Sequence, residues 1–197
     1  MNDLSAFIVA GLGEADAFER DLFDPKIRAS IRYADQAAWI TATAVNRALT
    51  AAGDGWSELR HQTGMIVVGD QGPRATMAGM QEEGAKGFSS PLHYAASGPW
   101  TLVGVSCIAF GFRGPTLSLT MDPQDGLATA LTLCQTWLAR KAARLMVVAT
   151  CRTDASGATL ARALLIAPPR VLAAGRPLTA AELDWLTATT PNSGAGA

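Results

Sequence analysis

The residues best placed for chemistry lie where a predicted strand turns sharply into a predicted helix, between Phe110 and Leu131. Thr116 to Met121 alternate polar and apolar side chains, which predicts a strand. Asp122-Pro123 then forces a turn, and the apolar spacing from Gly126 to Lys141 predicts a helix. Many α/β enzymes hold a nucleophile at such an elbow, beside the N–H groups of the helix start. The turn itself, residues 121–126, holds no Ser, Cys or Thr, so it lacks a hydroxyl or thiol nucleophile.

Other potentially reactive groups have simpler explanations. Asp122 and Asp125 flank the elbow, where turn formation and helix capping, with Asp125 as N-cap, explain them better than acid–base chemistry. Gly11-Leu12-Gly13 follows a short predicted strand, but no third glycine or suitably spaced acidic residue completes a dinucleotide site. Three single cysteines in apolar surroundings are typical of reduced core thiols, namely Cys107, Cys134 and Cys151. No Cys/His spacing predicts a metal site, and no cofactor is expected.

The composition points away from nucleic acid and membranes. The 197 residues carry a net charge of −1 without a basic cluster, and no apolar run approaches the roughly 20 residues of a membrane span. No cationic segment precedes the short apolar run at residues 6–12, so we expect no signal peptide and a cytoplasmic location. Charged residues make up 17 %, below the usual figure of about 25 %. This balance fits either an Ala-rich globular protein or a surface that a partner covers.

The order of predicted elements favours an α/β layered fold with a mostly parallel sheet. We expect strands near residues 7–9, 65–68, 116–121, 144–151 and 160–167. We expect a long helix over residues 26–52, one helix within 71–88, the helix after the elbow, and a last short helix capped by Thr179. The sequence predicts a single domain over residues 1–190 and a disordered tail over residues 191–197.

The ordered set of motifs resembles the β-ketoacyl synthases of the thiolase fold. It runs TGMIVVGDQGP, SPLHYAASGPW, IAFGFRGPTLSLT, the elbow, GLATAL and RLMVVAT, over roughly residues 4–168. Ketosynthases show a Ser-Pro followed by an apolar gate segment, a Gly-Pro before the nucleophile strand, and a Cys-containing turn that ends in Gly-Leu. The resemblance therefore implies half of a thiolase-like fold, a mostly parallel sheet with helices on its faces.

Two departures from that pattern imply that this chain does not catalyse condensation. Alignment on Gly126-Leu127 puts Pro123 at the position of the nucleophilic Cys, between Asp122 and Gln124. A full ketosynthase is about twice as long, and its second duplicated half, which supplies two catalytic histidines and a lysine, has no counterpart here. The histidines of this chain, His61 and His93, precede the elbow and match neither family position.

The family also contains non-catalytic members, the chain-length factors, which pair with an active ketosynthase and shape its tunnel. Many of them carry Gln at the Cys position, whereas Gln124 stands one residue late here. Short ketosynthase-like subunits accompany the synthases of aryl polyenes. The resemblance thus implies a half-length, chain-length-factor-like subunit of a type II polyketide or aryl polyene-type synthase. Its expected partners are a ketosynthase, in a heterodimer or heterotetramer, and the acyl carrier protein that the complex binds.

The resemblance also assigns surfaces to this chain. The family dimerises along the nucleophile strand, so the interface residues would be Thr116, Leu117, Ser118, Leu119, Thr120 and Met121. The gate segment carries over onto Leu92 and His93, with Trp100, Met77 and Met80 as further tunnel residues. Core or interface packing is the better explanation of each side chain taken singly, except that the His93 imidazole in this apolar segment needs a polar partner or faces a cavity. A half-fold would also leave one side of its sheet or its helices uncovered.

Two other functions remain open at this point. One is decarboxylation of malonyl-carrier protein, which would need donors that polarise the thioester carbonyl. The other is a stand-alone protein that binds or scaffolds acyl carrier proteins. The elbow itself can also be an internal strand of a self-contained small α/β domain.

Overall fold

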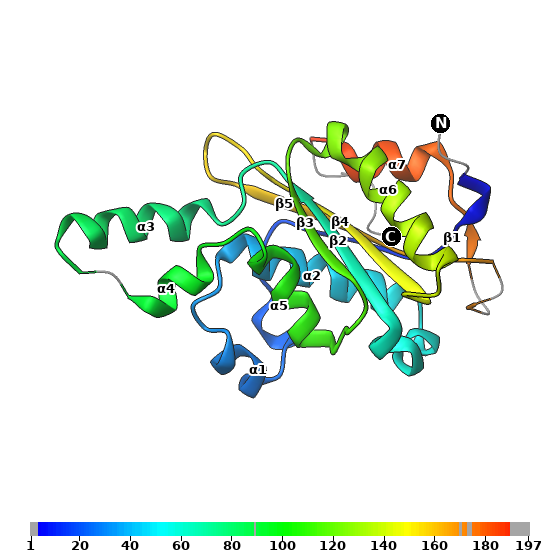
Figure 1. Ribbon diagram of the computed structural model, residues 1–197, viewed down its shortest axis with the longest axis horizontal. Helices are drawn as coiled ribbons and strands as arrows, with labels where there is room; N and C mark the ends of the chain where they lie inside the picture. The colour runs from blue at the N-terminus through cyan, green and yellow to red at the C-terminus, as the bar shows by residue number, and fades with distance from the viewer. Residues whose placement is uncertain (1–3, 89, 170, 173–174, 190–197) are drawn as a thin grey trace.

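A six-stranded sheet forms the centre of the computed structural model, which describes residues 4–88, 90–169, 171–172 and 175–189 (Figure 1). The strand order is β3-β2-β4-β5-β1-β6. The strands are β1 (Ile8–Ala15), β2 (Thr63–Gly69), β3 (Thr116–Thr120), β4 (Leu145–Thr153), β5 (Thr159–Ala167) and β6 (Arg176–Pro177). All five strand regions expected from the sequence are present, and β6 is an additional short strand. The predicted tail, residues 191–197, lies outside the described residues.

The sheet contains parallel and antiparallel pairs, whereas the sequence led us to expect mostly parallel pairing. β2 pairs in parallel with β3 and β4, whereas the pairs β4–β5, β5–β1 and β1–β6 are antiparallel. Strands β1 to β4 therefore point the same way, but β5 lies between β4 and β1 and runs against both. The reason is the short link from β4 to β5, residues 154–158, which is long enough for a hairpin and too short for a parallel crossover.

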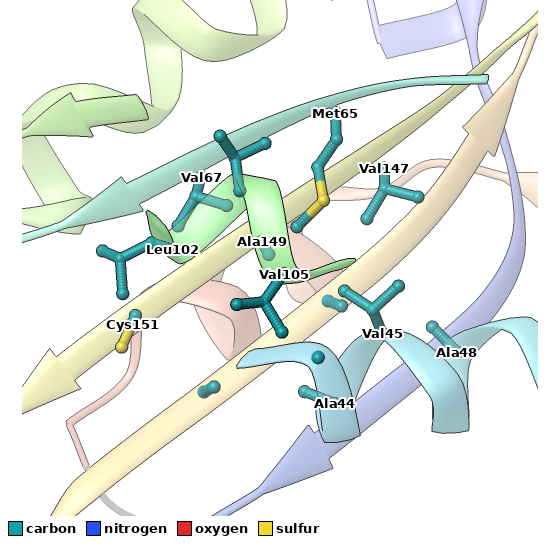
Figure 2. Packing of buried hydrophobic residues seen from close by; sticks show 14 of the residues in the cluster. Ala44, Val45, Ala48, Met65, Val67, Leu102, Val105, Val147, Ala149 and Cys151 are labelled. Atoms are coloured by element: carbon teal, nitrogen blue, oxygen red, sulfur yellow. The ribbon is translucent and has the colours of Figure 1, made fainter. Parts of the chain in front are cut away.

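Helices cover both faces of the sheet. On one face lie α2 (Gln36–Ala51) and α5 (Thr101–Phe110), and on the other lie α6 (Pro123–Ala139) and α7 (Ala180–Thr187) (Figure 1). Odd-numbered residues of β2 and β4 pack on the first pair of helices, and even-numbered residues pack on the second. Figure 2 shows the first layer, with Met65 and Val147 facing Val45 of α2 and Val105 of α5. The sequence led us to expect that one side of the sheet or its helices would be uncovered, and the first of these alternatives was wrong.

The predicted helix over residues 26–52 is in fact two helices. α1 (Pro25–Ser30) is capped by Asp24, and α2 starts after Asp35, whose side chain accepts the Ala37 N–H. Two glycines of β1 allow α2 to pack directly on the strand, because a Cβ on Gly11 would lie 2.0 Å from Ala48 O. The Gly-x-Gly spacing in β1 thus has a packing explanation. The short 3-10 helices are η1 (Leu4–Ala6), η2 (Arg20–Leu22) and η3 (Asp54–Gln62).

Two further helices project from the body of the molecule, at the left of Figure 1. They are α3 (Arg74–Ala85), which was expected, and α4 (Pro91–Ala96), and we call residues 74–96 the arm. None of the α3 residues, all of which the structure describes, is buried. Large apolar side chains of the arm and of its junction with α5 are exposed, among them Met77, Phe88, Leu92, Tyr94 and Trp100.

Candidate functional site: a closed elbow, an open edge and two grooves

The elbow between β3 and α6 forms where the sequence predicts it, with a different cap. Asp122 is the N-cap of α6, because its Oδ1 accepts a hydrogen bond from Gln124 N at 2.8 Å. Pro123 is the first helical residue, a position that proline favours because its missing N–H would have no helical partner. Asp125 lies in the first turn and is not the cap, so that expectation was wrong. The local Asp-Pro signal determined the helix start.

A second contact holds Asp122 from the far side of the elbow. Arg152, near the end of β4, donates to both carboxylate oxygens, with Nη1–Oδ2 and Nη2–Oδ1 distances of 2.8 Å. These bonds, together with the Gln124 N–H, hold the pKa of Asp122 below its ordinary value of 3.8. Asp122 is therefore ionised at neutral pH, and its negative charge faces the start of α6. A carboxylate that is already bound in this way is a poor general base.

The N–H groups at the start of α6 are already occupied. Pro123 has no N–H, and Gln124 N donates to the Asp122 side chain. Asp125 N and Gly126 N donate to Asp122 O at 3.0 and 2.9 Å. An enzyme that forms an oxyanion at such an elbow needs free N–H donors aimed at the reacting carbonyl. Within the described residues, the first turn of α6 offers none.

Tight packing fixes the elbow in place. A Cβ on Gly126 would lie 2.4 Å from Val68 Cγ1 and 2.8 Å from Met121 Cγ, so only glycine lets α6 approach β2 this closely. The thiols of the chain do not replace the missing nucleophile. Cys134 and Cys151 are buried and Cys107 is partly buried, and desolvation raises the pKa of each thiol to about 12.

Strand β3 is an open edge of the sheet. Pro115 O accepts a hydrogen bond from Met65 N at 3.0 Å, and Met121 N donates to Gly69 O at 3.1 Å. The backbone alternates along a strand, so the N–H and C=O groups of Thr116, Ser118 and Thr120 face away from β2. Among the described strands, β3 has a neighbour on one side only. Such an edge is a template for pairing with another chain.

The side chains of the edge strand divide between two directions. Leu117 and Leu119 are half-buried and pack against the core under α6. Thr116 and Thr120 are exposed and Ser118 is half-buried, and Met121 is partly exposed just beyond the strand. The six residues predicted at the interface thus form one continuous edge, but the two leucines also support the fold of this chain.

The residues predicted to line a tunnel divide between two neighbouring grooves. Leu92 and Trp100 line the first groove, a hollow of about 290 Å³ whose walls include Ile31, Tyr33, Val105 and Ile108. Met80 and His93 line the second, also of about 290 Å³, together with Arg32, Tyr33, Thr76 and Glu83. Tyr33 is shared by both grooves. Met77 lies in neither of them and is 49 % exposed.

His93 has a polar partner, as a half-buried imidazole requires. Its Nδ1 lies 2.8 Å from Glu83 Oε1 of α3. The edge of its ring packs against Tyr33, with the ring centroids 5.2 Å apart. His93 therefore links α4 to α3 and to the segment before α2, and it is a wall of the second groove held from two sides.

Three contributors to the site were missed from the sequence: Arg152, Asp35 and Tyr33. Arg152 offered a signal, because an arginine that ends the apolar run of β4 needs a partner when it is shielded from solvent. Asp35 offered a weaker one, since it stands where a cap would begin a second helix. Tyr33 offered none, because exposed aromatic residues in loops are common.

The fold of the chain matches solved ketosynthase structures. The chain aligns with a ketosynthase in complex with its chain length factor from Xenorhabdus doucetiae, with 21 % identity and a TM-score of 0.52, over 71 % of this chain and 60 % of that chain. The chain has the ketosynthase fold. No protein-family profile and no curated protein sequence matches it.

Two other ketosynthase structures show the same likeness. One is a type II polyketide synthase acyl-carrier protein in complex with its ketosynthase bound to the hexaketide, with 15 % identity and a TM-score of 0.65, over 84 % of this chain and 64 % of that chain. The other is the ishigamide ketosynthase/chain length factor, with 12 % identity and a TM-score of 0.55, over 88 % and 64 %. This chain thus spans 60–64 % of the length of these three chains. No helix in the described part of the chain has the length and apolarity needed to cross a membrane.

Proposed function

We propose that this chain is a non-catalytic ketosynthase-like subunit, a chain length factor, of a type II polyketide or related synthase. It pairs with an active ketosynthase and lines part of the tunnel that receives the growing acyl chain. The complex takes its substrates from an acyl carrier protein. The chain contributes walls and support, while the partner contributes the chemistry.

The observation that carries this proposal is that the first turn of α6 offers no free backbone N–H group. Alignment on Gly126-Leu127 puts Pro123 at the family's nucleophile position, and proline supplies neither a thiol nor an N–H. The next three N–H groups bond to Asp122, which Arg152 holds in place. These occupied groups support an elbow that serves the fold of this subunit and does not take part in acyl transfer. This pattern favours a supporting subunit over a decarboxylase, which also needs free donors at the thioester carbonyl.

The open edge supports the partnership. Three residues of β3 present unpaired backbone groups, and a second strand placed beside them would satisfy those groups. The exposed apolar side chains of the arm support it further, because a partner would cover them. Two of the similar structures are themselves described as a ketosynthase with its chain length factor.

The two grooves support the tunnel role. Both are predominantly concave surfaces at the junction of the arm and the body, and Leu92, Trp100, Met80 and His93 are their walls. Each groove is open to solvent on this chain alone. A second subunit docked on β3, which contacts α5 of the first groove, would close that groove into a channel.

A proline substitution tests the pairing without disturbing the fold. Ser118→Pro removes an N–H that faces away from β2 and places a ring where a partner strand would lie, and an edge strand tolerates this change. We expect Ser118→Pro to fold normally but to lose the complex when it is co-expressed with the ketosynthase from its own gene neighbourhood. Size-exclusion chromatography with mass determination gives the readout.

Two matched variants interpret the result. Ser118→Ala keeps the N–H and should keep the complex. Leu117→Pro removes an N–H that points toward β2, so it should unfold the chain rather than only separate the subunits. A Ser118→Pro chain that still forms the full amount of complex would exclude β3 as the interface. A parent chain that forms no complex and stays a monodisperse monomer would contradict the proposed function.

A further inference from the structure

Asp35 joins two helices that lie far apart in the sequence. It is only 5 % exposed, and both of its carboxyl oxygens accept hydrogen bonds. Oδ1 accepts from Ala37 N at 2.9 Å at the start of α2, while Oδ2 accepts from Thr76 N at 3.0 Å and from Thr76 Oγ1 at 2.9 Å. A single side chain thus caps α2 and holds the first turn of α3.

Little else holds α3 against the body. None of its residues is buried, so apolar packing stabilises its position only weakly. It also has a hollow on each side. Arg74, Ala75 and Ala78 line a pocket of about 360 Å³ that α3 shares with the loop joining β4 and β5, and Thr76, Gly79 and Met80 line the second groove. A helix between two hollows depends on its polar contacts for its direction.

The segment before α2 holds the arm at a second point. Tyr33, two residues before Asp35, packs its ring against His93 of α4, and His93 in turn bonds to Glu83 of α3. One short loop therefore contacts both helices of the arm, α3 through Asp35 and α4 through Tyr33. This loop is also where the single helix expected over residues 26–52 is interrupted.

We propose that Tyr33 and Asp35 form a clamp that fixes the direction of the arm, with Asp35 as the main positioning residue. The clamp keeps Met80 and His93 of the arm opposite Tyr33, and so sets the width of the second groove. It acts on the acyl chain through the groove walls and does not contact the reacting atoms. The link to the acyl chain rests on the proposed function, but the clamp itself does not.

Hydrogen–deuterium exchange of the full chain, in whichever assembly it is purified, tests the clamp directly. Thr76→Val removes the hydroxyl donor at nearly constant volume and leaves the α2 cap intact. Because this hydrogen bond holds the first turn of α3, we expect the described amides of the arm to exchange about tenfold faster or more when it is lost. Asp35→Asn should have at least the same effect. Thr76→Ser keeps the hydroxyl and should restore the parent rates.

Thr179→Val is the matched control. It removes a capping hydroxyl of α7, on the other face of the sheet, and should leave the exchange of the arm unchanged. Equal protection of the arm in the parent, Thr76→Val and Asp35→Asn would overturn the clamp. Faster exchange spread evenly over α2, α6 and the sheet would also overturn it, because that result describes general destabilisation.

A second readout connects the clamp to the tunnel. In the reconstituted complex with the ketosynthase, Thr76→Val should broaden the distribution of product lengths at an unchanged amount of complex, and Thr76→Ser should return it to the parent distribution. An unchanged distribution together with a loosened arm would remove the arm from the tunnel and leave the clamp standing. If the parent chain forms no complex with the ketosynthase, the proposed function is contradicted. The exchange data would still decide the clamp.

Discussion

The centre of the sheet and the arm are built on opposite principles. Every residue of β2 is buried, as are the first seven of β4, and both faces of these strands are covered by helices. No residue of α3 is buried, and α4 buries Ala96 alone. The centre is held by apolar packing spread over many side chains. The arm is held by a few polar and aromatic contacts, with Asp35 and His93 at its two ends.

This difference identifies the arm as the part of the molecule whose position a single side chain can change. The position of the central strands depends on many apolar contacts, so no single polar group decides it. The direction of the arm depends on a few polar contacts, so the loss of either the Asp35 or the His93 contact should change it. The arm also carries the large exposed side chains and the groove walls. A surface of this kind is what the proposed supporting role requires, because a partner can cover the exposed side chains and close the grooves.

Two methionines give the largest expected contrast. Met146 in β4 is fully buried, whereas Met77 in α3 is 49 % exposed. Met146→Ala should lower the free energy of unfolding by about 2–5 kcal/mol, because it leaves a cavity in a packed core. Met77→Ala should change it by less than about 0.5 kcal/mol. Chemical denaturation of the two variants measures both values, and similar losses would remove the contrast between centre and arm.

A substitution at the elbow should lower the free energy of unfolding by an amount between these two values. Its pH dependence tests the ion pair between Asp122 and Arg152. Asp122→Asn keeps a capping side chain but loses the ion pair with Arg152, which is partly exposed, so the expected loss at pH 7 is at most about 1 kcal/mol. The pKa of Asp122 is lowered in the folded state, so its contribution is present above about pH 4 and is lost as the pH falls through the lowered value. The difference between parent and variant should therefore shrink between pH 7 and pH 3. A difference that is constant over this range would show that the ion pair contributes nothing.

The strands could be predicted because each has a local signal. The apolar runs of β2, β4 and β5 have strand length, and Thr179 with Glu182 forms the expected capping box at α7. The elbow was predicted for the same reason, since Asp122-Pro123 fixes a turn by itself. The antiparallel position of β5 was not predicted, because strand pairing depends on where the hairpin returns, which composition does not report.

The contacts that hold the site were hidden by sequence distance. Asp122 and Arg152 are 30 residues apart, and Asp35 and Thr76 are 41 apart. No periodicity links such pairs, so each residue taken alone looks like a surface charge or a cap. The loop between α1 and α2 was missed because it contains no Gly or Pro. After α1 ends, Asp35 accepts hydrogen bonds both at the start of α2 and from Thr76 of the arm.

Trp100 tests the first groove with a moderate effect. It is 58 % exposed, and its Nε1 donates to Ala95 O at 3.3 Å, so its removal should cost little stability. Each methylene newly buried is worth about 0.8 kcal/mol, which changes a product ratio several-fold. We expect Trp100→Ala to lengthen the products of the reconstituted complex by about one or two extension cycles, and Leu92→Trp to shorten them. His93→Ala, in the second groove, should lengthen them and also broaden their distribution, because it removes the contact of α4 with Glu83 of α3. Mass spectrometry of carrier-bound products provides the measurement, and unchanged lengths in all three variants would remove these residues from the tunnel.

The smallest expected effect concerns the elbow itself. Pro123→Cys places a thiol where the sequence resemblance puts the family's nucleophile, yet the Gln124, Asp125 and Gly126 N–H groups remain bonded to Asp122. When the new thiol attacks an acyl thioester, the oxyanion of the tetrahedral intermediate would find only the new N–H of residue 123 as a donor. We therefore expect intact-protein mass spectrometry to find no acylation of this subunit in a complex whose ketosynthase thiol has been blocked. The double variant Pro123→Cys/Asp122→Ala frees the Gln124 N–H and should show more acylation than the single one. Rapid acylation of the single variant would mean that the closed helix start is not what prevents acyl transfer, and that the missing thiol alone does so.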